Sequence, residues 1–138
     1  MRKCIVVGLA TIGLAGSVAA MDLHYYTSSG LVGTFVDRQG IDCCTNGKEK
    51  KVTFPALQLD QPINVTAANP QTAEEDEMPE QGIRLLQLAL KDKSQWRLFN
   101  QNKDKRVRVT CSLFHSTNGH HLTPVLCDVQ QINKADQY

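Results

Sequence analysis

Residues 106–114 carry the feature that most constrains the fold, a strict alternation of side-chain character. Apolar residues occupy the odd positions of this segment from 107 onward, and polar or charged residues occupy most of the even ones. A period of two is typical of a β-strand with one face in a core. Asn118-Gly119 follows, a dipeptide typical of tight hairpin turns, and residues 121–132 form a second strand-like run. The sequence therefore predicts a β-hairpin as the last part of the fold.

Four earlier segments fit regular elements: strands at 31–36, 52–59 and 82–90, and a short helix at 91–102. Ser94 is a candidate N-cap of the helix. Trp96 and Phe99 lie three positions apart, so both are predicted to face the core. Three strands, a helix and two strands is the element order of an OB-fold. We therefore predict a mainly β fold, a small five-stranded OB-like barrel with one short helix between strands 3 and 4. Another small barrel or an open sandwich is the alternative.

The first twenty residues fit a secretory signal peptide. Two positive charges precede an apolar run, and small residues end at Ala20. We predict a signal peptide at 1–20, a single domain at 21–138, and a periplasmic or secreted location. The full chain has 15 basic and 14 acidic residues, and cleavage would remove two of the basic ones, which leaves 13. This near-neutral balance argues against nucleic-acid binding, which needs a basic surface. No second apolar segment is long enough to predict membrane attachment after cleavage.

Four cysteines remain after such cleavage: Cys43, Cys44, Cys111 and Cys127. An even number in an exported chain predicts disulfides. Cys111 and Cys127 are equally distant from residue 119, so a bridge across the last hairpin is one alternative. It would leave two adjacent cysteines, in a loop predicted at 37–51, to pair with each other. We therefore predict the other alternative, two bridges from this loop to the last hairpin.

Residues 66–81 are acidic and nearly free of apolar side chains, which predicts a solvated, mobile loop. A functional interpretation makes part of this loop a docking patch for a partner. Its candidate partner-binding residues are Glu74, Glu75, Asp76 and Glu77.

Chemically versatile residues gather at the last hairpin, where three of the four histidines lie. The candidate ligand-binding or partner-binding residues here are His115, Thr117, His120, His121 and Thr123. Imidazole is a common metal ligand, so His115, His120 and His121 form a hypothetical site for a divalent metal. Adjacent residues of a strand point to opposite faces, so these three need an irregular turn to converge. A structural cluster that bonds its own hairpin is the alternative, and no cofactor is predicted otherwise.

The last hairpin resembles that of a family of small exported bacterial domains of unknown function. Residues 118–126, NGHHLTPVL, are similar to its T-G-H-H-H-T-P-V-L motif. Residues 107–115 are similar to its penultimate strand, 57–63 to its L-x-L-D-x-P-I stretch, and 33–35 to its first strand. The resemblance implies an OB-like fold and export. It implies no activity.

Two residues depart from the family pattern. Leu122 stands where the motif has its third histidine. Cys111 stands where the family usually has glycine, and Cys127 is a further cysteine, which implies a disulfide specific to this branch.

No nucleophile elbow, zinc-protease motif or phosphate-binding glycine loop occurs in the chain. We therefore predict no enzyme activity. The hypothesis is an exported binding module that contacts another protein of the cell envelope, in the manner of an inhibitor or immunity protein. The alternative is a protein that binds a metal or small ligand with its histidine-rich hairpin.

Overall fold

The structure is a computed structural model that describes residues 19–135. Its elements are β1 (Met21–His24), β2 (Ser28–Thr45), β3 (Lys48–Thr66), the 3₁₀ turns η1 (Pro70–Thr72) and η2 (Glu75–Glu77), β4 (Glu80–Ala89), α1 (Lys93–Gln101), β5 (Arg106–His115) and β6 (Val125–Lys134). The predicted signal peptide lies outside the described residues except for its last two. No helix within 19–135 has the length and apolarity needed to cross a membrane.

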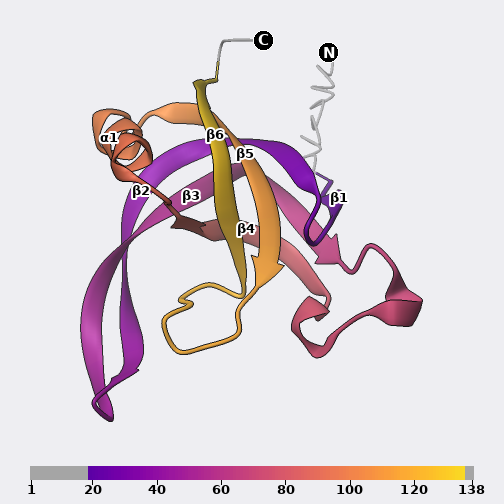
Figure 1. The fold of residues 1–138 in the computed structure, drawn as a ribbon. Helices are drawn as coiled ribbons and strands as arrows, with labels where there is room; N and C mark the ends of the chain where they lie inside the picture. The colour runs from indigo at the N-terminus through magenta and orange to yellow at the C-terminus, as the bar shows by residue number, and fades with distance from the viewer. Residues whose placement is uncertain (1–18, 136–138) are drawn as a thin grey trace, which may run out of the picture.

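Five long strands close into a barrel (Figure 1). The ring runs from β3 through β2, β5, β6 and β4 back to β3, and only the β4–β6 pair is parallel. The short β1 adds to the edge of β3 in parallel. The helix follows the third long strand. The predicted OB-like barrel is therefore confirmed.

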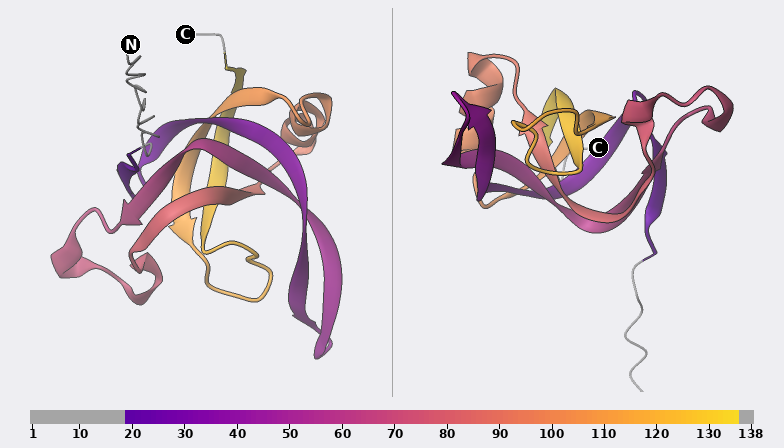
Figure 2. Two further views of the ribbon diagram at one scale, coloured as in Figure 1. Left: turned by 180° about the vertical axis from the view of Figure 1, so that it is seen from behind. Right: turned by 90° about the horizontal axis from the view of Figure 1, so that it is seen from below.

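The β2–β3 hairpin is much longer than the sequence predicts. Asn46 and Gly47 both have positive φ, 58° and 73°, as in the two-residue turn that matches the twist of paired strands. The strands therefore continue to this turn, and the loop predicted at 37–51 is wrong. Figure 2 shows the resulting arm projecting from the barrel at the same end as the connection between β5 and β6.

One continuous core fills the barrel, with side chains from all six strands and the helix around it. Its largest fully buried members are Tyr25, Phe35, Phe99, Leu31, Leu57, Ile63, Leu86 and Leu113. The inward residues of β5 are the odd ones, as the alternation at 106–114 predicts.

Helix α1 contributes a single buried side chain to this core. Phe99 is 1% exposed, and its ring centroid lies 5.1 Å from that of Phe35. Trp96 is 44% exposed, so the prediction that both aromatics face the core holds only for Phe99. The N-cap is Asp92, whose carboxylate accepts from the Gln95 N–H at 2.9 Å, and this bond lowers the pKa of Asp92. The predicted cap, Ser94, lies inside the first turn.

The disulfides differ from the predicted pairing. Cys111 is bonded to Cys127, with Cα atoms 5.0 Å apart, and Cys43 is bonded to Cys44. Cys111 lies opposite Val129 in the β5–β6 ladder, so the two strand cysteines are diagonal neighbours on its inner face. Both are fully buried there. The prediction of two bridges to the 43–44 segment is therefore wrong, because the two strand cysteines face the interior and bond each other.

Candidate functional site

The connection between β5 and β6 is a nine-residue loop, residues 116–124, which we call the β5–β6 loop. The Ser116 N–H donates to the Pro124 carbonyl at 2.9 Å and closes its base. Proline has no N–H for a ladder, so regular pairing stops here. The two-residue hairpin turn predicted at Asn118-Gly119 is therefore wrong. Those residues lie at the far end of the loop, in a turn closed by the His121 N–H, which donates to the Asn118 carbonyl at 3.2 Å.

Thr123 anchors the loop from inside. It is buried, and its hydroxyl donates to the Val125 carbonyl at 2.6 Å while accepting from the Gln87 N–H at 3.0 Å. Both hydrogen-bonding roles of the hydroxyl are thereby used within the fold. The structure thus places this predicted site residue in a structural position.

The β5–β6 loop covers the outer face of β3 and β4. Gln87 alternates with the buried leucines of β4, so its side chain points outward. Its amide donates to the His120 carbonyl at 3.3 Å and accepts from the Leu122 N–H. Leu122 packs on Gly40, where an added Cβ would lie 3.2 Å from the Leu122 and Phe54 side chains. OB-folds commonly bind ligands on this face, and here the chain's own loop occupies it.

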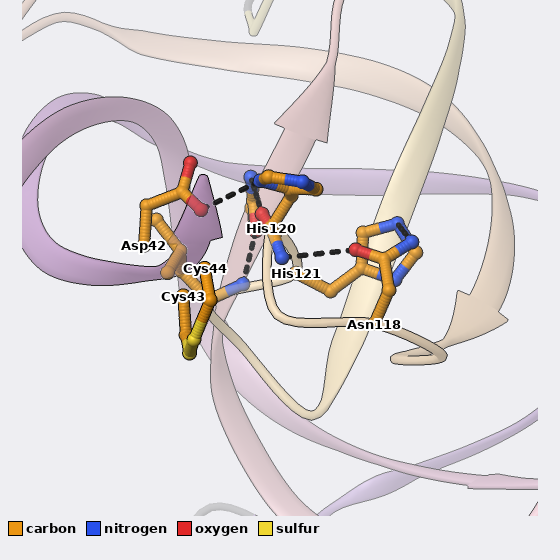
Figure 3. Close-up of polar contacts among 8 residues, drawn as sticks. Asp42, Cys43, Cys44, Asn118, His120 and His121 are labelled. Atoms are coloured by element: carbon orange, nitrogen blue, oxygen red, sulfur yellow. Dashed lines mark hydrogen bonds and ion pairs between the residues drawn. A yellow bond between two sulfur atoms is a disulfide. The ribbon is translucent and has the colours of Figure 1, made fainter. Parts of the chain in front are cut away.

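The tip of the loop is docked on the β2–β3 arm (Figure 3). The Cys43 N–H donates to the Gly119 carbonyl at 3.2 Å. A Cβ at Gly119 would lie 1.9 Å from the Cys43 carbonyl oxygen, so only glycine fits this approach. His120 Nδ1 donates to Asp42 Oδ1 at 2.6 Å. Cys43 therefore meets the last hairpin through a backbone hydrogen bond, and the neighbouring Asp42 meets it through a hydrogen bond with His120.

The three clustered histidines have separate partners. His115 Nε2 lies 2.8 Å from Glu80, and His120 contacts Asp42. His121 accepts a hydrogen bond from a backbone N–H of its own loop. Among residues 19–135, no group of three or more His, Cys, Asp or Glu side chains is placed to hold a metal ion. The fold therefore does not assemble His115, His120 and His121 as one ligand set.

A shallow groove of about 420 Å³ lies on the other side of the β5–β6 loop. It is lined by Tyr26, Asp76, Ala89, Ser112, Phe114, His115, Thr117, His121 and Asp128. The rings of Phe114 and His121 meet edge to face, with centroids 5.6 Å apart. Four predicted site residues, Asp76, His115, Thr117 and His121, are thus brought together, although two sequence-distant segments supply them.

The remaining predicted site residues lie elsewhere. His120 faces the β2–β3 arm, and Thr123 is buried in the loop base. Glu74, Glu75 and Glu77 lie in or beside the turn η2 and do not line the groove.

The acidic segment reaches the groove because several contacts hold it. Glu74 and Glu77 form a reciprocal capping box around η2. The Tyr25 hydroxyl donates to the Met78 carbonyl at 2.6 Å, and the Tyr26 hydroxyl donates to Asp76 Oδ2 at 3.0 Å. Burial and the Asp76 carboxylate raise the pKa of Tyr26. The segment predicted as a mobile loop therefore has defined turns and fixed contacts to the barrel.

Sequence reasoning missed five groove residues, one of which is Ala89 at the end of β4. Ser112 and Phe114 are the outward residues near the end of β5, and Asp128 is their counterpart on β6. Tyr26 adopts positive φ, 58°, in the turn after β1. One sequence signal for these residues was available. Phe114 is an aromatic residue at an even position of 106–114, where the other residues are polar or charged, so an exposed aromatic side chain could have been predicted there.

A pH prediction follows from His121. The Thr117 N–H donates to His121 Nδ1 at 2.9 Å, which requires that this nitrogen carry no proton. Burial, and then the neighbouring His120, lower the pKa of His121 in the folded protein. The unfolded chain therefore binds more protons between that lowered pKa and about 6.5. The contribution of His121 to the free energy of unfolding is therefore fully present above about pH 6.5. It is lost as the pH falls toward and through the lowered pKa of the folded protein.

We expect the free energy of unfolding to fall between pH 7.5 and pH 5, and to fall less in His121→Gln. Urea titrations of both proteins at the two pH values measure the difference. Equal losses in the two proteins would assign the pH dependence to other groups.

Comparison with known families finds a match over the segment that supplies seven of the nine groove-lining residues, all but Tyr26 and Asp76. Residues 85–133 match the model of a family described as Domain of unknown function (DUF4431). This span runs from β4 through β6 and includes the β5–β6 loop. No curated protein and no solved structure matches the chain. The likeness supports a relation of this segment to a domain family of unknown function.

Proposed function

We propose that this chain is an exported, non-catalytic binding module that contacts another protein of the cell envelope, as an inhibitor or immunity protein does. The observation that carries the proposal is the groove itself. It joins the acidic segment to the histidine-containing loop, with Tyr26 and Phe114 between polar side chains. Aromatic residues presented among polar ones are typical of protein interfaces.

The neighbouring surface supports a protein partner. Tyr26 and Met78 are each 57% exposed, on segments joined by the Tyr26–Asp76 hydrogen bond. Tyrosine and methionine are enriched at interfaces. The contacts of η2 order this surface before binding, which reduces the entropy lost on association.

Export is supported by the cysteines. The buried Cys111–Cys127 disulfide is typical of proteins from an oxidising compartment. A periplasmic or secreted location is therefore part of the proposal.

The hydrogen bonding of the groove supports a non-catalytic role. The Thr117 hydroxyl lies 3.5 Å from His121 Nδ1, a distance at which a base could activate it. That nitrogen already accepts the Thr117 backbone N–H at 2.9 Å. His115 is likewise engaged by Glu80 and by a backbone carbonyl. Both ring nitrogens of His115 and the Nδ1 atom of His121 are thus committed to structural hydrogen bonds.

Site-specific photo-crosslinking in the native cells tests the proposal. A benzophenone amino acid replaces Tyr26 in one protein and Trp96 in a matched control. Both aromatics are exposed, but Trp96 lies on α1, outside the groove. We expect a discrete protein adduct from position 26 and none of the same size from position 96. No adduct at 26, or identical adducts at both positions, would contradict the proposal.

A further inference from the structure

We propose that the groove receives an arginine side chain of the partner protein. This inference rests on the proposed function and specifies the chemistry of its partner. The groove combines exposed aromatic surface with carboxylates whose charge the fold offsets only in part.

The charges of the groove carry the first step. Asp76 and Asp128 line it. Within the described residues, Asp76 receives a neutral hydrogen bond from Tyr26. Asp128 pairs with Lys91 at 3.1 Å, where both side chains are exposed. Exposed ion pairs are weak and exchange partners readily. A cation that enters the groove therefore finds one carboxylate, Asp76, that forms no ion pair within residues 19–135, and a second, Asp128, whose partner is easily displaced.

The histidines of the groove do not supply a positive charge that would neutralise these two carboxylates. His121 accepts a backbone N–H at Nδ1, which keeps its ring neutral. His115 donates to the Glu80 carboxylate, so any charge on that ring is offset locally. The glutamates beside η2 add to the negative potential at the groove mouth and would steer a basic partner toward it.

The aromatic residues select guanidinium over a compact ammonium group. A planar guanidinium stacks on aromatic rings and donates in a fork to carboxylates. Tyr26 and Phe114 provide the rings, and Asp76 provides an acceptor beside Tyr26. A volume of about 420 Å³ accommodates the whole side chain rather than its tip alone. Arginine therefore matches the groove better than lysine does.

An NMR titration of the ¹⁵N-labelled protein tests the inference. The probe is acetyl-Gly-Arg-Gly-amide, and the control is the same peptide with citrulline, which has nearly the shape of arginine without its charge. We expect saturable shifts of the Tyr26, Ser112 and Thr117 amides with the arginine peptide, at a Kd on the order of millimolar. The citrulline peptide should bind roughly tenfold more weakly or not at all, because charge-assisted bonds are the stronger kind.

Two isosteric variants distinguish binding in the groove from a general electrostatic effect of the acidic segment. Asp76→Asn and Glu75→Gln each remove one negative charge from the same turn, and only Asp76 lines the groove. We expect Asp76→Asn to weaken arginine binding by about fivefold or more and Glu75→Gln by less than about twofold. Equal effects of the two variants, or equal binding of citrulline, would overturn the inference.

The outcomes also separate this inference from the proposed function. A Tyr26-specific crosslink without arginine binding removes the arginine inference and leaves the protein-binding proposal in place. Arginine binding without any crosslink removes the protein-binding proposal, and with it the partner named here.

Discussion

Replacing Phe99 with alanine should lower the free energy of unfolding by about 3–5 kcal/mol. Phe99 is the only buried residue of α1 and packs on Phe35 of β2. Alanine would leave a cavity at the point where the helix joins the core. Urea denaturation, fitted for both midpoint and slope, measures the loss.

Trp96→Ala is the matched control for this prediction. It removes a larger aromatic side chain from the same helix, but from a position that is 44% exposed. We expect a loss of about 1 kcal/mol or less, as for most surface substitutions. If the two variants lost similar stability, the helix would be held by its outer face rather than by Phe99.

Replacing both Cys111 and Cys127 with alanine should cost about 3 kcal/mol. The bond closes a segment with a sequence separation of 16, and closing such a segment restricts the unfolded chain. Loss of two buried sulfur atoms from the core adds to the cost. Urea denaturation under non-reducing conditions gives the value directly.

The same double replacement at Cys43 and Cys44 is the contrasting case. These residues are adjacent, so their bond encloses almost no chain and restricts the unfolded state little. We expect a loss below about 1 kcal/mol. A larger loss there than at Cys111 and Cys127 would contradict the chain-entropy explanation for both bonds.

The barrel and the candidate site depend on different contacts. Phe99 and the Cys111–Cys127 bond hold the closed core, whereas the β5–β6 loop is held by Gln87, Thr123 and the approach of Gly119 to the β2–β3 arm. A variant of the loop surface should therefore change binding with little effect on global stability. This separation makes the groove variants interpretable as binding variants.

Local patterns in the sequence were sufficient for the barrel. The two-residue period of 106–114 defines the inner and outer faces of β5, because alternation is a property of the strand alone. The element order then restricts the topology to few arrangements, and the OB-like barrel is among them. The N-terminus of the helix was predictable to within two residues because helix formation is also local, although the cap is Asp92 and not Ser94.

The tertiary structure alone decided the site. Whether Cys111 pairs with Cys127 depends on strand register and on which face is buried, and neither follows from a count of cysteines. The β5–β6 loop stays open because Gln87 and Cys43, distant in sequence, bond to it. The sequence alone thus determined the strand faces and the acidic and histidine-rich segments. Their meeting in one groove required long-range packing, because the groove joins residues as far apart in sequence as Tyr26 and Asp128.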